Sequence, residues 1–481
     1  MLLGFVSFPI LARVFSVADY GIMSLVLKLV LLMTVLGKFG LQNSVQRFYP
    51  EEGKSLNSAV RRKYYSSLIT GSAVVGTLAM AAYAAGLWLA PERLLEPRLR
   101  YLLLFTSGLI LIRSLQPTLI GFLRAEGRTK TYNSIEIGTR AATVLTACTL
   151  LIVWKRELTV FLGTTIAVEA AAVLALLWFL YKQRVFAVSS FNRQYFQKAA
   201  LFAFPLIGYE LASVILDSGD RLFVQRYMGA QALGYYSAAY NIATYVEESL
   251  MVPINLALFP IYMRIWIEKG KEETQAFLSR SLNNFVTLAI GIVCVVLLTS
   301  KDLIVVLASS KFQEAHRLLP VLVVGLLVYA IHIFLNAALL IHKKTRTMAA
   351  LVVYSCVANI VLNVVLIPKI GLQGAAMATL LSYMFLLWLM ARVSFRLLPL
   401  NINYYGFLAN LAAAALTFAA VRNVQFSKAL LSGAVKGVLG FLLYSIFVVL
   451  LNPALRRSLS GRLRGLFKEA KPPQPVTAPS V

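Results

Sequence analysis

The sequence has few charged residues and few cysteines for its length. Of 481 residues only 14% are charged and 59% are apolar, whereas soluble domains have about 25% charged and about 45–50% apolar residues. Cys148, Cys294 and Cys356 lie inside apolar stretches, without the spacing of a zinc site or the even number of a disulfide framework. HExxH, nucleophile-elbow, Walker A and CxxC motifs are also missing, so neither a metal site nor enzymatic chemistry is indicated.

Long apolar blocks make up most of the chain, and the mean hydropathy is +0.75. Blocks of about 18–25 residues match a helix that crosses a hydrocarbon core about 30 Å thick. Because lipid offers no hydrogen bonds, such blocks form helices. The sequence therefore predicts an all-α polytopic membrane protein with about fourteen spans. The predicted spans are residues 1–14, 20–40, 65–90, 100–122, 133–153, 158–180, 198–217, 233–260, 282–300, 317–341, 348–367, 371–391, 405–421 and 429–450.

The net charge of +26 is concentrated in alternate loops between these spans. Cytoplasmic loops carry an excess of Lys and Arg, so these loops and both termini are predicted to be cytoplasmic, in the plasma (inner) membrane. The charge therefore reflects topology and not nucleic-acid binding. The basic loop residues include Arg47, Lys54, Arg61, Arg62, Lys63, Arg124, Arg128, Lys130, Lys182, Arg184, Arg193, Lys198, Arg264, Lys269, Lys271, Arg280, Lys343, Lys344, Arg346, Arg392 and Arg396.

An internal repeat predicts the domain organisation. Residues 13–24 match residues 226–237 without a gap at an offset of 213, and residues 128–130 match 344–346 at a nearly equal offset. Six spans separate equivalent positions, which preserves orientation and predicts two parallel six-helix lobes with a cleft between them. The expected domains are an N-lobe at 1–195, a C-lobe at 196–391, an appended helix pair at 392–455 and a basic, Pro-rich cytoplasmic tail at 456–481.

Four segments resemble the polysaccharide (O-antigen) flippase branch of the multidrug/oligosaccharidyl-lipid/polysaccharide exporter superfamily. They are LARVFSVADYG (11–21), GLQNSVQRFYPEEG (40–53), DRLFVQRYMGAQALGYYSAAY (220–240) and LNVVLIPKIGLQGAAMAT (362–379). The resemblance implies a flippase for undecaprenyl-pyrophosphate-linked oligosaccharide, used in surface polysaccharide such as lipopolysaccharide. Its implied partners are that lipid-linked oligosaccharide and membrane lipids, with a glycan polymerase and a chain-length regulator as candidates. Arg13 matches an arginine that the related peptidoglycan-precursor flippase carries at the end of its first helix.

Basic residues within spans are the candidate substrate-binding groups, because charges in spans tend to face a cavity or one another. Lys28 and its repeat equivalent Asn241 are expected on the wall of the cleft. Lys28, Lys38, Arg113 and Arg140 could bind a pyrophosphate. The alternatives are that Arg140 pairs with Glu136, four residues earlier on its helix, and that Lys38 extends to the inner interface. The predicted substrate-binding set is Arg13, Lys28, Lys38, Arg113, Arg140 and Asn241.

Acidic residues in the spans are the candidates for ion coupling or a gate. Glu210, Asp217 and Arg221 follow one helix face, and Glu169 has no partner on its own helix. Such carboxylates could bind H⁺ or Na⁺ and couple its gradient to transport, with no other cofactor. The alternative is a salt bridge of Asp217 or Asp220 with Arg221 at an outer gate. The predicted set is Glu169, Glu210, Asp217, Asp220, Arg221 and Glu248.

Two other functions stay open. A multidrug exporter of the same superfamily would need a cavity dominated by acidic and aromatic groups, whereas this chain places Lys28 near the centre of a span. A membrane glycosyltransferase or polymerase would need a large soluble loop, whereas the longest loops here are about twenty residues long. The sequence therefore favours transport of an anionic substrate by alternating access.

Overall fold

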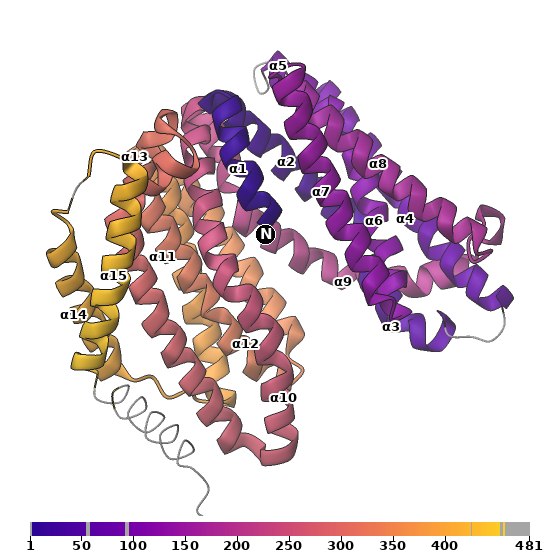
Figure 1. Cartoon of the computed structure of the whole chain (residues 1–481). Coiled ribbons are helices and arrows are strands. Elements are labelled where there is room, and N and C mark those ends of the chain that lie inside the picture. The colour runs from indigo at the N-terminus through magenta and orange to yellow at the C-terminus, as the bar shows by residue number, and fades with distance from the viewer. Residues whose placement is uncertain (1, 54–57, 92–95, 425, 453–455, 457–481) are drawn as a thin grey trace, which may run out of the picture. The chain divides into compact units, whose positions relative to one another are not determined.

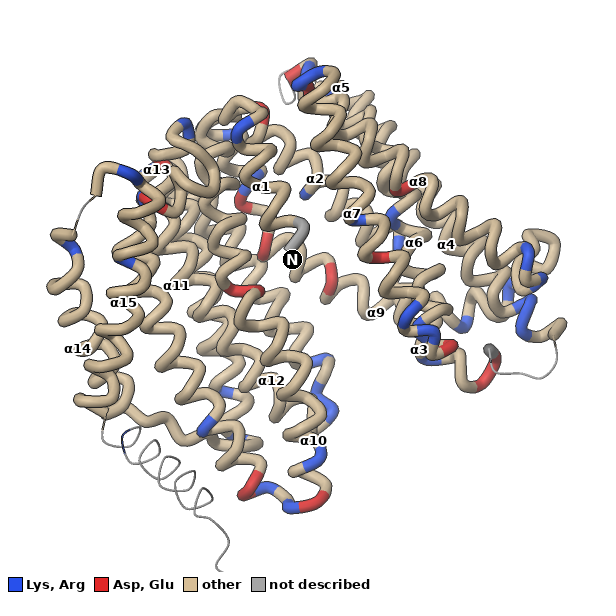
Figure 2. The backbone as a smooth tube through the Cα atoms, viewed as in Figure 1, with Lys and Arg blue, Asp and Glu red and all other residues tan. Residues whose placement is uncertain are grey.

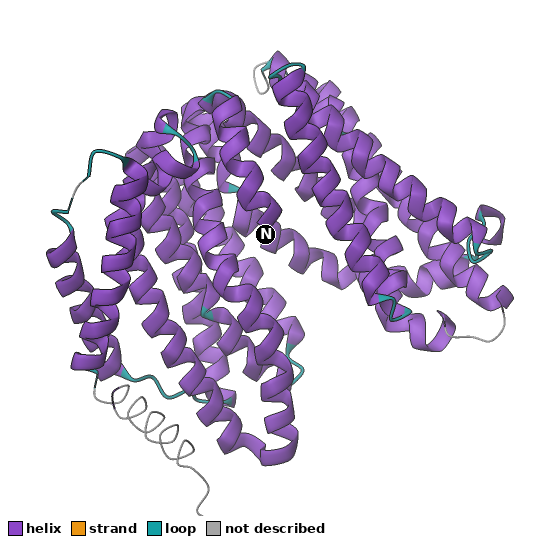
Figure 3. Ribbon diagram, viewed as in Figure 1, coloured by secondary structure: helices purple, strands orange, loops and turns teal. Residues whose placement is uncertain are grey.

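The computed structural model describes residues 2–53, 58–91, 96–424, 426–452 and 456, and in these ranges the regular structure is helical (Figure 1; Figure 3). The prediction of an all-α fold is confirmed. The predicted tail at 456–481 lies outside the described residues apart from Arg456. The helices are α1 (Leu2–Val14), α2 (Val17–Lys38), α3 (Leu41–Phe48), η1 (Tyr49–Gly53), α4 (Ser58–Leu89), α5 (Pro97–Phe105), α6 (Gly108–Ala125), α7 (Thr129–Val153), α8 (Leu158–Lys182), η2 (Val188–Ser190), α9 (Arg193–Ser218), α10 (Asp220–Leu307), η3 (Ser310–Arg317), α11 (Leu319–Ala330), α12 (His332–Ile341), α13 (Thr345–Leu397), α14 (Tyr404–Val421) and α15 (Ala429–Leu451).

Glycines interrupt the two longest helices. In α10 the φ angles of Gly229 and Gly270 are 81° and 80°, and in α13 the φ of Gly371 is 61°. Glycine adopts these left-handed conformations without a steric penalty. Gly270 separates the predicted spans 233–260 and 282–300, and Gly371 begins the span 371–391 just after 348–367. Gly229 is the repeat equivalent of Ser16, whose side chain caps α2 directly after α1.

The helices have the length and composition of membrane spans. Among the described residues, ten helical segments are apolar and long enough to cross a bilayer. In this count α5 with α6, α9 with α10, and α11 with α12 are each taken as one segment. Most charged positions lie near the ends of helices, while a few interrupt the apolar lengths (Figure 2). The chain is therefore a multi-pass membrane protein, and the number of fourteen spans stays a prediction.

The contacts divide the chain into two compact units. The first unit comprises Met1–Asn255 and Ile304–Ser394, and within it α2, α4 and α6 pack on one another and α2 packs on α9. In its core the rings of Tyr65 and Phe122 stack at 3.9 Å between centroids.

The second unit comprises Leu256–Leu303 and Phe395–Val481. Here α14 packs on α15, and the hydroxyl of Tyr444 donates to the carbonyl of Thr287 at 2.7 Å. The expected boundaries at 195, 391 and 455 stay a prediction.

Candidate functional site

Two lysines of α2 form ion pairs with two carboxylates of α9. Lys28 Nζ lies 3.1 Å from Asp217 Oδ2, and Lys38 pairs with Glu210. The partners are 189 and 172 residues apart in the sequence, so each pair joins the first part of the repeat to the second. The structure thus brings together two predicted substrate-binding cations and two predicted coupling carboxylates.

Each of these carboxylates also has uncharged donors. Asp217 accepts hydrogen bonds from the hydroxyls of Ser218 (2.6 Å) and Tyr240 (3.1 Å). Glu210 accepts a longer bond of 3.4 Å from the side-chain amide of Gln42, which α3 contributes. Hydrogen bonds from several donors stabilise the charged form of a carboxylate in a low-dielectric environment.

The lysine pairs are partly accessible. The side chains of Lys28 and Asp217 are 30% and 45% exposed, and those of Lys38 and Glu210 are 13% and 28% exposed. Lys28 lies near the middle of α2, where a charge costs about 2.5–3.5 kcal/mol on insertion scales. The partial exposure of this charge therefore favours contact with water or with a polar cargo over contact with lipid.

A third pair, Asp220 with Arg221, is fully buried at the start of α10. Arg221 Nη1 lies 3.4 Å from Asp220 Oδ1, and the two side chains are 0% and 1% exposed. Asp220 also accepts a hydrogen bond from Tyr236 and one of 3.3 Å from Thr379 of α13. A buried pair with these extra donors positions α10 against α13, which fits a structural role.

The guanidinium of Arg221 connects the buried pair to Asp217. Its carbon lies 4.3 Å from the ring centre of Tyr240, whose hydroxyl bonds Asp217, and its Nη1 donates to the Asp217 carbonyl at 3.3 Å. Its Nε and Nη2 atoms are buried and have no hydrogen-bond partner among the described residues. The aromatic face of Tyr240 supplies part of the missing stabilisation through a cation–π contact.

Arg113 of α6 and Glu169 of α8 form a bidentate ion pair. Arg113 Nε and Nη2 lie 2.8 and 2.7 Å from the two carboxylate oxygens of Glu169, and the side chains are 24% and 14% exposed. The planar fork of arginine matches a carboxylate in this geometry. One predicted substrate ligand and one predicted coupling residue are thus each other's partners.

The remaining predicted site residues lie apart from these pairs. Arg140 is exposed and pairs with Glu136 at 3.0 Å, as the helical alternative predicts. Arg13 donates to the carbonyls of Pro9 and Val306. Asn241 donates to the Tyr20 hydroxyl at 2.5 Å. This bond joins the second part of the repeat to the first, and the contact of Lys28 with Asp217 joins the first part to the second. Glu248 is half-buried in α10.

Sequence reasoning missed the tyrosines around the acidic groups. Tyr236 and Tyr240 are one helical turn apart in α10, and Tyr240 meets Tyr383 of α13 at 3.3 Å between hydroxyls. The signal available in the sequence was the pair of tyrosines at i and i+4 beside Asn241. Their hydroxyls needed partners at this depth, and Asp217 and Asp220 supply them.

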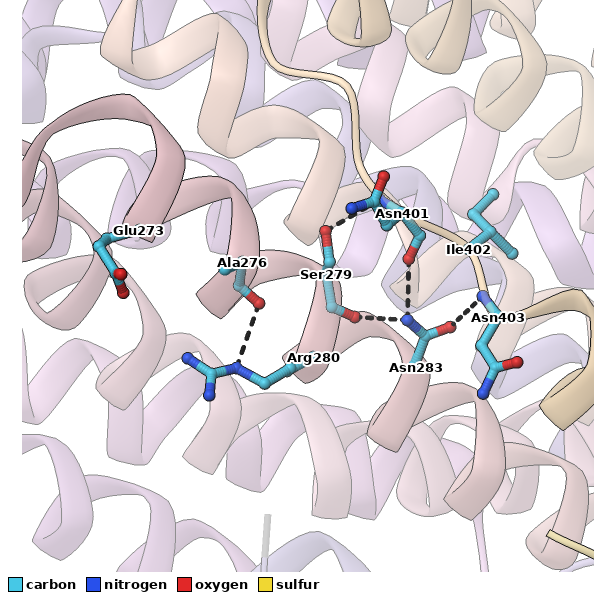
Figure 4. Close-up of a pocket in the computed structure, with 8 residues that line it drawn as sticks. All are labelled: Glu273, Ala276, Ser279, Arg280, Asn283, Asn401, Ile402 and Asn403. Carbon is cyan, nitrogen blue, oxygen red and sulfur yellow. Dashed lines mark hydrogen bonds between the residues drawn. The ribbon is translucent and has the colours of Figure 1, made fainter. Parts of the chain in front are cut away.

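A polar pocket of about 500 Å³ lies in the second unit (Figure 4). There the side chain of Asn283 of α10 donates to the backbone carbonyl of Asn401 at 2.9 Å and accepts from the backbone N–H of Asn403 at 3.0 Å. The hydroxyl of Ser279 accepts from the backbone N–H of Asn401. These bonds attach the segment before α14 to α10. The polar groups therefore satisfy one another, which is the pattern of a structural junction. In the ranges that the structure describes, no three His, Cys, Asp or Glu side chains are placed to hold a metal ion.

Comparison with known proteins adds a family and relatives. The family model described as polysaccharide biosynthesis protein matches residues 1–266. The chain is similar to the probable low-salt glycan biosynthesis flippase Agl15 of Haloferax volcanii, with 24% identity over 221 residues that make up 44% of this chain and 45% of that protein. It is similar to the succinoglycan biosynthesis transport protein ExoT of Rhizobium meliloti, with 24% identity over 284 residues, 58% of this chain and 53% of that protein. The chain thus spans about half the length of these curated relatives.

Solved membrane transporters share the fold. The lipid II flippase MurJ in an inward closed conformation has a TM-score of 0.77 at 15% identity, over 94% of this chain and 97% of that one. An inward-facing multidrug resistance MATE family transporter of the MOP superfamily has a TM-score of 0.66 at 11% identity, over 82% of this chain and 94% of that one. At these identities the likeness shows the fold alone.

Proposed function

Because the chain belongs to the polysaccharide biosynthesis protein family, we propose that it is a flippase that moves an undecaprenyl-pyrophosphate-linked oligosaccharide from the cytoplasmic to the outer leaflet during surface polysaccharide assembly. The family description supports a role in polysaccharide assembly. The transporter fold supports a translocation step in place of covalent chemistry.

The lysine pairs of α2 carry the proposal of an anionic cargo. Lys28 and Lys38 are cations within one apolar helix, and their only charged partners among the described residues are Asp217 and Glu210 of α9. A pyrophosphate needs cationic donors in a water-poor setting, where each charge-assisted bond is strong. These lysines also occupy the carboxylates that a hydrophobic cation, the cargo of a multidrug exporter, would need.

Alternating access supplies the motion. Ion pairs and hydrogen bonds between side chains join the two parts of the repeat. Such contacts are reversible, so they can break as the cleft opens to the other leaflet. H⁺ or Na⁺ binding to the released carboxylates would bias the two arrangements through its differential affinity. We place both termini in the cytoplasm of a plasma (inner) membrane, where the glycan polymerase and chain-length regulator would receive the exported lipid.

Deletion of the gene and complementation in its own host tests this function. Loss of surface glycan together with accumulation of lipid-linked oligosaccharide supports the proposal, and restoration by wild type but not by Lys28→Ala with Lys38→Ala supports the site. Lys436→Gln is the matched control, because Lys436 forms a comparable pair with Asp302 at 3.0 Å in the second unit. Intact glycan with altered drug susceptibility would favour the multidrug exporter. Elongation of lipid-linked oligosaccharide by the purified protein would favour a polymerase.

A further inference from the structure

The two lysines assigned to the cargo already hold anions. Lys28 contacts Asp217, and Lys38 contacts Glu210. A lysine is a point charge on a flexible stem that changes partners without a fixed geometry. Each ammonium keeps further N–H donors, but the carboxylate beside it repels a second anion, so a diphosphate that approaches these lysines competes with the carboxylates for the positive charge.

We propose that Asp217 and Glu210 act as internal stand-ins for a phosphate of the cargo, and that a lipid diphosphate binds by displacing a carboxylate from its lysine, Asp217 from Lys28 or Glu210 from Lys38. This inference rests on the proposed function and adds to it a competition between protein and cargo. Without cargo, the two carboxylates neutralise Lys28 and Lys38, so neither lysine is an unpaired cation.

The surroundings of the carboxylates make displacement feasible. When Lys28 turns to the cargo, Asp217 keeps the hydroxyls of Ser218 and Tyr240. When Lys38 turns away, Glu210 keeps the amide of Gln42. Neither carboxylate is left without a donor, so the large cost of an unpaired buried charge is avoided.

Two other ion pairs of the first unit that involve predicted site residues are less open to exchange. Arg221 and Asp220 are fully buried, so a cargo cannot reach them. Arg113 holds both oxygens of Glu169, and a phosphate would have to break two parallel bonds at once. The lysine pairs have a single ammonium contact and a partly exposed surface, which is the combination that exchange requires.

Competition also gives selectivity. A neutral or cationic molecule offers nothing to replace the carboxylates. Lys28 and Lys38 are ten residues apart on α2, about 15 Å along the helix axis, so one diphosphate is expected to replace one carboxylate at a time. A diphosphate carries more negative charge than a carboxylate, so it competes for a lysine better than a singly charged anion does.

Binding measurements on the full chain in lipid nanodiscs test the inference. Farnesyl diphosphate serves as the probe and farnesol as the matched uncharged ligand, with affinity measured by calorimetry. Asp217→Asn and Glu210→Gln remove the competing charge and keep the shape of each side chain. Each substitution is expected to tighten farnesyl diphosphate binding about fivefold, the effect of losing a partly exposed ion pair. Asp302→Asn, which removes the partner of Lys436, is expected to leave the affinity unchanged.

The outcomes separate the inference from the proposed function. Tighter binding by the carboxylate variants and weaker binding by Lys28→Gln with Lys38→Gln support displacement. Unchanged or weaker binding by the carboxylate variants overturns displacement, while weak binding by the lysine variants still supports the anionic site. Equal binding by wild type and lysine variants overturns both assignments at this site. A melting curve for each variant, and the two single substitutions measured separately, exclude misfolding as the cause.

Discussion

Gly21 of α2 and Gly234 of α10 are equivalent positions of the internal repeat, and they touch each other. A Cβ atom on Gly21 would lie 2.6 Å from the Gly234 backbone nitrogen and 2.5 Å from the Ala230 carbonyl oxygen, and one on Gly234 would lie 2.0 Å from the Val17 carbonyl oxygen. Two equivalent positions can touch only near the axis that relates them. The contact is therefore where the twofold axis expected from the repeat would pass.

This contact predicts the effect of adding a methyl group. Gly234→Ala forces α2 and α10 apart, at a cost of about 1–3 kcal/mol for overpacking. We expect surface glycan export to fall while the protein still accumulates in the membrane. Gly138→Ala in α7 is the control, since among the described residues the added Cβ has no neighbour within 4 Å beyond the adjacent backbone of its own helix. Normal export by Gly234→Ala would show that this close approach is not needed in the transport cycle.

The buried pair at the start of α10 predicts a large effect on stability. Arg221→Met leaves Asp220 buried and unpaired, and breaking such a pair costs about 3–5 kcal/mol. We expect a clear drop in the melting temperature of the purified protein. Adding Asp220→Asn removes the orphaned charge and should recover most of the loss. An exposed pair provides the comparison: Arg47→Ala, which removes the contact of Arg47 with Glu51, should change stability by less than about 1 kcal/mol.

Reversal of the Arg113 and Glu169 charges distinguishes structure from cargo binding. If this pair only joins α6 to α8, Arg113→Glu with Glu169→Arg should restore the export that either single substitution removes. We expect this rescue, because Arg113 Nε and Nη2 each bond one oxygen of the Glu169 carboxylate. Stable protein with no export in the double variant would instead indicate that the cation must stay on α6, where it could contact the cargo.

The helices were predictable because membrane insertion depends on local composition. The predicted span 158–180 corresponds to α8 (Leu158–Lys182), and 429–450 corresponds to α15 (Ala429–Leu451). About twenty apolar residues suffice to specify such a helix, whatever its neighbours are. The break at Gly229 was not predicted, although the repeat carries a signal for it: Gly229 is equivalent to Ser16, which lies between the predicted spans 1–14 and 20–40.

The pairing of the charges was only partly predictable. The sequence placed Glu210 and Asp217 on one face of a helix and Lys28 within another, but it could not show that α2 packs on α9. The partners are more than 170 residues apart, and their contact depends on tertiary packing with no local signal. Arg140 with Glu136 was the exception, because residues four apart on a helix are neighbours by geometry.

The most direct test of the account is a translocation assay in proteoliposomes with a fluorescent undecaprenyl-pyrophosphate-linked oligosaccharide, whose transfer between leaflets is followed by accessibility to a membrane-impermeant quencher. The account predicts rapid transfer by the wild-type chain, a rate lower by about tenfold or more for Lys28→Gln with Lys38→Gln, and a wild-type rate for Lys436→Gln. Equal rates for the wild-type chain and for liposomes without protein would contradict it.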